Sequence, residues 1–201
     1  MKNLALVVLV SGNGSNLQAI LDSIGSGELE AEVKAVISNN ENAYALERAK
    51  LARVPTEVLI KVKEQNRSDY DFQLAEVVSR YQPEWIILAG WMRILSMSFL
   101  SRFPGKVINL HPALPGEFPG IHSIERAYQS FKDGEIDQSG VMVHLVPDEG
   151  VDSGPVLNQR VVEFLPGESL DQFEARMHTC EHVLLVETLQ NLINKMEDKN
   201  A

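Results

Sequence analysis

Cysteine is almost missing from this sequence of 201 residues, which contains only Cys180. A single cysteine excludes a framework of structural disulfides and fits a reducing compartment, so we expect a cytoplasmic protein. Long apolar runs are missing too. The apolar segment 4–10 stops at Ser11 and Gly12, far short of the roughly 20 residues that cross a membrane. It is also too short for a signal peptide, and we expect no membrane partner.

Basic residues are scarce: 18 lysines and arginines stand against 28 aspartates and glutamates, and the net charge is −10. Nucleic acid is usually held by basic stripes, so this balance argues against a nucleic-acid partner. It does not exclude small anions, because backbone N–H groups at a helix N-terminus bind phosphate without basic side chains. The length suffices for one α/β domain whose core needs neither a disulfide nor a metal.

The sequence gives no support for three common kinds of reactive site: a serine nucleophile, a cysteine nucleophile and a metal site. No Gly-x-Ser-x-Gly segment exists that would supply a serine nucleophile. Cys180 falls within a helical apolar pattern and is expected in the core. Several histidines lack zinc-type spacing with partner ligands, so we expect no metal: His122, His144, His178 and His182.

Apolar segments rich in β-formers alternate with amphipathic helical segments along the first half of the chain. Segment 4–10 is typical of a strand buried on both faces, and Leu17, Ile20 and Ile24 have the spacing of one helical face. Further strands are expected over 33–37, 56–60, 85–89 and 107–110, and further helices over 43–52 and 68–81, the last capped by Ser68. This order predicts a doubly wound, mostly parallel α/β sheet, in which ligands bind beyond the carboxyl ends of the strands.

The second half has a different pattern. Strands are expected over 141–145 and 160–164, and a long helix follows Ser169, which forms a capping box with Gln172. We therefore expect a mixed C-terminal part of the sheet and a long C-terminal helix. Because no linker or repeat separates the halves, we expect a single domain over 1–201. Its two lobes would cover 1–104 and 105–201.

A glycine-containing loop, Ser11-Gly12-Asn13-Gly14-Ser15-Asn16, joins the first strand to the first helix. Its glycines let a ligand approach the backbone, and the helix start offers free N–H groups. Leu17 replaces the third glycine of a dinucleotide fingerprint, and there is no Gly-Lys-Ser/Thr as in ATP-type phosphate loops. The loop therefore indicates either a site for a single phosphate, as on a phosphoribosyl group, or an ordinary turn.

Asn109 and His111 stand at the end of the fifth expected strand, immediately before a proline. Two residues apart on a strand, both side chains point to the same side, so an amide N–H and an imidazolium could hold one oxyanion. A carboxylate of the acidic loop 148–155 could raise the pKa of the imidazole and fix its tautomer. The alternative is a strand end whose side chains simply bond to each other. His178 and Glu181 lie three residues apart on one helix face. This pair has the same two alternatives: it contacts a ligand, or the two side chains contact only each other.

Together these segments resemble the phosphoribosylglycinamide formyltransferase family over about residues 3–190. The resemblance rests on the glycine loop 11–16, on Leu88-Ala89-Gly90-Trp91-Met92-Arg93-Ile94-Leu95, on Asn109-Leu110-His111-Pro112 and on the acidic loop 148–155. Trp91 stands where the family commonly has phenylalanine, and the stretch 148–152 is one residue longer than in common members. The resemblance implies the formyltransferase fold.

The resemblance also implies residue roles. The catalytic residues would be Asn109, His111 and Asp152. The substrate, glycinamide ribonucleotide, would be held by Gly14, Ser15 and Asn16 at its phosphate and by Glu181 at its ribose. The folate would be held by Arg67, Met92, Arg93, Ile94, Leu95, Asn109 and Asp148, with the rest of the loop to Asp152.

The implied reaction is transfer of the formyl group of N10-formyltetrahydrofolate to the amine of N1-(5-phospho-D-ribosyl)glycinamide, a step of purine (IMP) biosynthesis. It gives formylglycinamide ribonucleotide and tetrahydrofolate without a metal. Two rival classes stay open: a hydrolase that gives the formyl group to water, and a ligand-binding module without catalysis. A binding module would not need Asn109, His111 and Asp152 to converge. The sequence leaves open whether the protein is a monomer or a homodimer.

Overall fold

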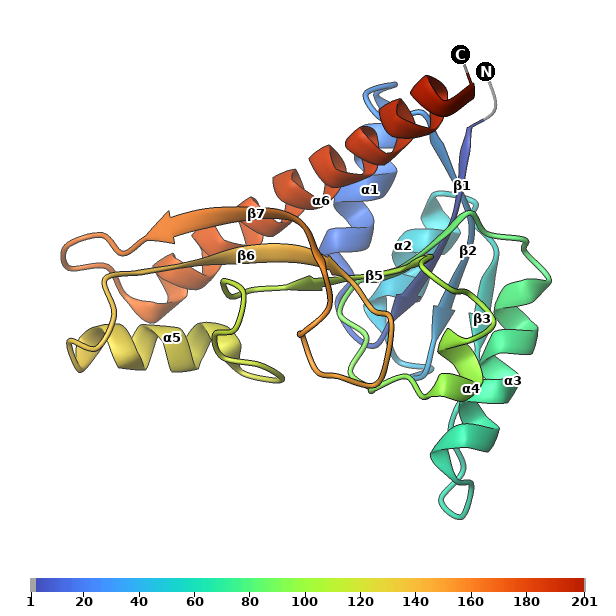
Figure 1. Ribbon diagram of the computed structural model, residues 1–201, viewed down its shortest axis with the longest axis horizontal. Helices are drawn as coiled ribbons and strands as arrows, with labels where there is room; N and C mark the ends of the chain where they lie inside the picture. The colour runs from blue at the N-terminus through green and yellow to red at the C-terminus, as the bar shows by residue number, and fades with distance from the viewer. Residues whose placement is uncertain (1–2, 201) are drawn as a thin grey trace.

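A computed structural model describes residues 3–200 and shows one twisted seven-stranded sheet (Figure 1). The spatial order of the strands is β3-β2-β1-β4-β5-β6-β7; β1 to β5 are parallel, and β6 pairs antiparallel with both β5 and β7. The strands are β1 (Leu4–Val10), β2 (Ala31–Ser38), β3 (Thr56–Val58), β4 (Trp85–Leu88), β5 (Val107–His111), β6 (Gln138–Leu145) and β7 (Val156–Glu163). The predicted doubly wound, mostly parallel sheet with a mixed C-terminal part is confirmed.

Helices cover both faces of this sheet and separate two apolar cores. The helices are α1 (Ser15–Gly25), α2 (Tyr44–Leu51), α3 (Arg67–Ser79), α4 (Met97–Leu100), α5 (Ser123–Lys132) and α6 (Leu170–Asn200). One core joins α1, α2, α5 and α6 to one face of the sheet, and the other joins α3 and α4 to the opposite face. Along β1 the residues alternate between the two cores, with Leu6 and Val8 in one and Val7 and Leu9 in the other. A central strand apolar on both sides is the expected result.

The helix starts follow local hydrogen bonding, with one correction to the sequence prediction. The cap of α3 is Asn66, not Ser68, because the Asn66 side chain accepts the hydrogen bond of the Asp69 N–H at 2.8 Å. The predicted capping box of α6 is confirmed: Gln172 N–H donates to the Ser169 hydroxyl at 3.3 Å, and Ser169 N–H donates to the Gln172 side chain at 2.9 Å.

Two helices, α4 and α5, were missing from the sequence prediction. A helix as short as α4, with four residues, gives almost no periodic signal. The start of α5 is hidden because its cap, His122, has a positive φ of 57° and makes no side-chain capping bond. Within residues 3–200, no helix is both long and apolar enough to cross a membrane.

Candidate active site

The site is built where β5 extends past its neighbour. Leu88, the last residue of β4, pairs with Asn109, so Asn109 and His111 lie at and beyond the carboxyl end of β4. Both side chains reach the same residue, Asp152. Asn109 Nδ2 donates to Asp152 Oδ1 at 2.9 Å, and His111 Nδ1 lies 3.3 Å from Asp152 Oδ2. The structure therefore brings together the three residues that the sequence suggested as a catalytic trio.

Asp152 is held in a conformation that a non-glycine residue seldom adopts, with a φ of 49°. Besides Asn109 and His111, the backbone N–H of Gly120 donates to its Oδ2 at 2.8 Å. Backbone strain of this kind costs about 1–3 kcal/mol and persists only where surrounding contacts fix it. The carboxylate is thus positioned by groups from β5 and from the loop after it.

A fourth polar residue, His144 of β6, completes the cluster and was not singled out from the sequence. It pairs with Asn109 across the antiparallel strands, and its Nε2 lies 3.2 Å from Asn109 Nδ2 and 3.5 Å from Asp152 Oδ1. Its Nδ1 donates to the carbonyl of Leu145 at 2.8 Å, which fixes the tautomer. The signal in the sequence was weak: a single histidine in an alternating strand is usually a core residue.

Burial and the carboxylate act on His111 in opposite directions. Burial lowers the pKa of the imidazole below its ordinary 6.5, and Asp152 raises the pKa only in part. The sequence indicated that a carboxylate of the acidic loop could raise this pKa; Asp152 does so, but desolvation dominates and favours the neutral ring. Burial would raise the pKa of the Asp152 carboxyl, but the neighbouring His144 ring and the Gly120 N–H outweigh burial and lower it.

One atom of the cluster has no partner. His111 Nε2 is buried and has no hydrogen-bond partner, and His111 Nδ1 faces Asp152. The backbone carbonyls of Glu117 and Phe118 also lie near the ring and raise its pKa. A buried, unpaired ring nitrogen is costly unless a ligand satisfies it. By contrast, both N–H bonds of the Asn109 amide already point at acceptors, Asp152 and His144. The group free to meet a substrate is therefore His111 Nε2, and Asn109 would have to exchange one bond to donate to an oxyanion.

The glycine loop lies at the carboxyl end of β1 and starts α1. Gly14 caps the helix with a φ of 77°, and Ser15 and Asn16 form its first turn. A Cβ on Gly14 would lie 2.5 Å from the Cβ of Ala45 in α2, so this glycine is required by helix packing. A Cβ on Gly12 would have nothing within 4 Å. A side chain would thus find free space at Gly12 but would collide with α2 at Gly14.

Arg48 of α2 fixes this loop through its guanidinium. Its guanidinium donates to the backbone and side-chain oxygens of Asn13, each at 2.9 Å, and to Gln18 at 3.0 Å. The Asn16 side-chain oxygen is buried without a partner. Glu181, on α6, is buried and bound to His178, with Glu181 Oε2 2.5 Å from His178 Nδ1. This contact raises the pKa of His178.

The segment after β4 divides its side chains between solvent and core. Met92 and Ile94 are exposed apolar residues, whereas Leu95 is buried in the α3 core. Arg93 lies over the ring of Tyr70, 4.9 Å from its centroid, and its buried Nε has no partner. The segment is tied to the glycine loop, because Met92 N–H donates to the Ser11 hydroxyl at 2.9 Å.

Arg67 and the acidic loop meet, but through a residue that the sequence prediction did not emphasise. Arg67, the first residue of α3, forms an ion pair with Glu149. Asp148 instead accepts the N–H of Gly150 within the loop at 2.8 Å. Of the two acidic residues, Glu149 is therefore the one that joins the loop to α3.

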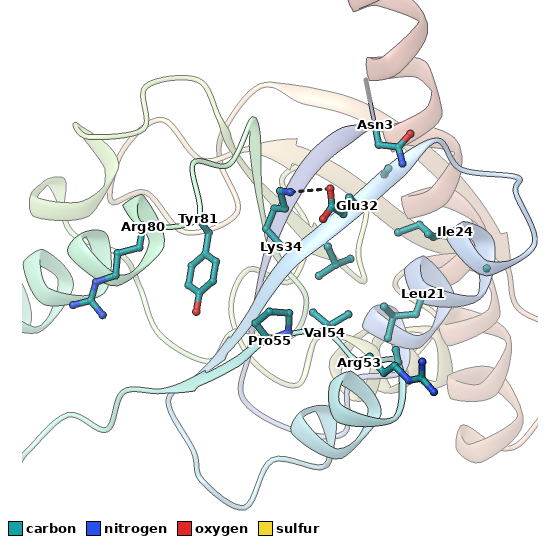
Figure 2. A pocket seen from close by; sticks show the side chains of 14 residues that line it. Asn3, Leu21, Ile24, Glu32, Lys34, Arg53, Val54, Pro55, Arg80 and Tyr81 are labelled. Carbon is teal, nitrogen blue, oxygen red and sulfur yellow. Dashed lines mark hydrogen bonds and ion pairs between the residues drawn. The ribbon is translucent and has the colours of Figure 1, made fainter. Parts of the chain in front are cut away.

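The hollow of about 850 Å³ shown in Figure 2 lies at the opposite edge of the sheet. It is bounded by the start of β2, where Lys34 pairs with Glu32 at 2.8 Å, and by Arg53 and Arg80 after α2 and α3. None of the predicted site residues lines it. Among the described residues, no group of three or more His, Cys, Asp or Glu could hold a metal ion.

A mostly parallel α/β sheet with a convergent His-Asp-Asn cluster beyond the end of β4 is an arrangement that suits an enzyme. The sequence matches the formyl transferase family over residues 4–189, and the chain belongs to that family, on the phosphoribosylglycinamide formyltransferase branch. The Dictyostelium discoideum phosphoribosylglycinamide formyltransferase is 46% identical over 94% of this chain and 98% of its own length. The Schizosaccharomyces pombe protein of the same name is 44% identical over 94% and 97%.

A solved structure agrees in fold. The crystal structure of phosphoribosylglycinamide formyltransferase from Bacillus halodurans superposes with a TM-score of 0.88 at 30% sequence identity, and the match covers 96% of both chains. The predicted family, fold and enzyme class are therefore confirmed, whereas the roles of the individual site residues stay predictions.

Proposed function

We propose that the cluster of Asn109, His111 and Asp152 carries the family reaction in this chain. The enzyme transfers the formyl group of N10-formyltetrahydrofolate to the amine of N1-(5-phospho-D-ribosyl)glycinamide, in purine biosynthesis. The observation that supports these residue roles is the convergence of the three side chains, with the buried His111 Nε2 left without a partner. A binding module would have no need of this arrangement.

In this proposal His111 starts as a neutral base, in keeping with the lowered pKa. The substrate amine attacks the formyl carbon, the carbonyl bond opens to an oxyanion, and Nε2 accepts the proton of the amine. The imidazolium, held by Asp152, then stabilises the negative oxygen, with one Asn109 N–H exchanged from His144 to that oxygen. When the carbon–N10 bond breaks, N10 leaves with the proton from Nε2.

The two substrates would occupy neighbouring parts of the carboxyl edge. Backbone N–H groups from Gly14 to Asn16 would hold the phosphate, and Glu181 would contact the ribose. Folate would lie against the exposed Met92 and Ile94, with Arg93, Leu95, Arg67 and Asp148 around it. The bond from Met92 N–H to the Ser11 hydroxyl supports adjacent subsites.

We also propose the division into a nucleotide-binding lobe, 1–104, and a catalytic and folate-binding lobe, 105–201. Both lobes belong to one sheet. The lone cysteine, buried at position 180, fits a cytoplasmic protein. We also propose a homodimer, which light scattering distinguishes from a monomer by its mass.

The reaction can be tested with purified protein, formyl folate and glycinamide ribonucleotide, with a metal chelator present. Formation of deformylated folate and of formylated amine is followed together. We expect equal amounts of both, and only when the amine is added. Release of formate without the amine would indicate a hydrolase, and no turnover of either substrate would leave a binding module.

A further inference from the structure

The acidic loop that carries Asp152 is fastened at both ends to strands. Val146 N–H donates to the carbonyl of Val107 at 2.9 Å, and Leu145 N–H donates to the carbonyl of Pro155 at 2.9 Å. Between these ends the loop is folded tightly, since a Cβ on Gly150 would lie 2.4 Å from the Ser153 hydroxyl. The tip of the loop is held against the rest of the protein by other contacts.

Glu149 makes two contacts outside the loop, and both reach the first lobe. Its Oε1 accepts the N–H of Met97, the first residue of α4, at 3.0 Å, and its Oε2 forms the ion pair with Arg67. The N–H of Met97 needs this partner, because Ser96 makes no side-chain cap bond to α4. The carboxylate thus satisfies a backbone donor and a guanidinium with one side chain.

The two anchors of Glu149 are firm. The helices α3 and α4 pack together, and Phe99 of α4 is fully buried in their shared core. Ser96 N–H also donates to the buried carboxylate of Asp71 at 2.6 Å, which fixes the entry to α4. The segment that we assign to folate ends just before this point, at Leu95. A loop fastened here is fastened beside the folate subsite.

We propose that Glu149 is a positioning residue for the formyl transfer: it ties the acidic loop to α3 and α4 and thereby holds Asp152 against His111. The reasoning rests on the proposed function of the trio. Asp152 is three residues from Glu149 and keeps a strained φ of 49°, so it depends on contacts that fix the loop. When the tie is cut, the loop relaxes and Asp152 withdraws from His111.

The contacts of Glu149 predict a graded series of variants. Glu149→Ala removes both contacts and should lower kcat/KM by about tenfold, the effect of roughly one strong hydrogen bond. Glu149→Gln keeps an oxygen for the Met97 N–H and loses only the charge, so the loss should be about threefold, within the range of exposed ion pairs. A matched control is Glu76→Gln, which breaks the ion pair of Glu76 with Arg102, at similar exposure and away from the loop. This control should keep full activity.

Two readouts separate positioning from a general effect on structure. Because Asp152 raises the pKa of His111, the acid limb of the kcat/KM profile should move to lower pH in Glu149→Ala, but not in Glu76→Gln. In an Asp152→Asn background, Glu149→Ala should cause no further loss, since its effect passes through Asp152.

Three results would overturn the tie. The losses from Glu149→Ala and Asp152→Asn could simply multiply, the acid limb could stay in place, or folate KM could fall with kcat unchanged. The last result would mean that Glu149 merely competes with folate for Arg67.

If the wild type itself does not transfer the formyl group, the proposed function fails. If the wild type does so and the Glu149 variants behave like Glu76→Gln, only the tie fails.

Discussion

The two edges of the sheet differ: the amino edge has an open hollow, and the carboxyl edge has a cluster of buried polar side chains. The amino edge contains the hollow of about 850 Å³, yet its Arg53 and Arg80 are exposed and the polar residues there are solvated or paired. The carboxyl edge instead gathers buried polar groups, with His111 and His144 almost fully enclosed and a strained Asp152 between them. Buried and unpaired polar atoms are costly, so they locate a site better than volume does.

The largest loss of activity is expected from a substitution of His111 at the carboxyl edge. If Nε2 carries the proton and faces the oxyanion, His111→Ala should lower kcat by about 10²–10³-fold, with little change in substrate affinity. Steady-state kinetics with both substrates measures this effect. Near-normal turnover in this variant would remove His111 from the mechanism and leave the carboxyl edge without its reacting group.

A smaller effect is expected at His144, which touches the trio but is not proposed to meet the substrate. His144→Gln keeps a polar side chain in the strand but changes the contacts to Asn109 and Asp152. The expected loss in kcat is about tenfold, the size of one displaced hydrogen bond to a charged group. A loss equal to that of His111→Ala would give His144 a direct catalytic role instead.

The two glycines of the glycine loop, which we propose to bind phosphate, should separate packing from binding. Gly14→Ala places a Cβ 2.5 Å from Ala45 at a positive φ, so it should destabilise the fold by about 1–3 kcal/mol in denaturant unfolding. Gly12→Ala has free space in the protein alone. It should raise the KM for glycinamide ribonucleotide a few-fold while stability and folate KM stay unchanged. Unchanged substrate KM in Gly12→Ala would place the phosphate elsewhere.

The smallest effect is expected at the amino edge. Arg53→Ala removes an exposed guanidinium that borders the hollow. This residue lies at the amino edge of the sheet, away from the trio. The kcat/KM should change by less than about twofold, since exposed charges contribute little. A tenfold loss would mean that the hollow takes part in the reaction, and the contrast between the two edges would fail.

Most of the fold could be predicted because long apolar strands and amphipathic helices leave periodic signals. Segment 4–10 was predicted with its observed bounds, and the carboxyl-edge loops followed from the parallel order. The short α4 was not predictable from periodicity, and the start of α5 depends on a left-handed His122. Strand ends shifted by a few residues, as for β3, because pairing with neighbours decides them.

The site was predictable only in part, since sequence spacing does not report contacts across the sheet. Asn109 and His111 were found because they lie two residues apart on one strand. His144 joins them through antiparallel pairing with Asn109, and Glu149 joins Arg67 from 82 residues away. The sign of the His111 pKa shift also depends on burial, which no motif encodes.

We propose that His111 is a buried base whose pKa is lowered by burial and partly restored by Asp152. NMR titration of the His111 imidazole in the wild type and in Asp152→Asn tests it most directly. We expect a pKa below the ordinary 6.5 in the wild type and a still lower pKa in the variant, because an attractive carboxylate is lost. The acid limb of activity should follow, since the neutral ring is lost as pH falls through that pKa. A wild-type pKa at or above 6.5, or an unchanged or higher pKa in Asp152→Asn, would contradict the account.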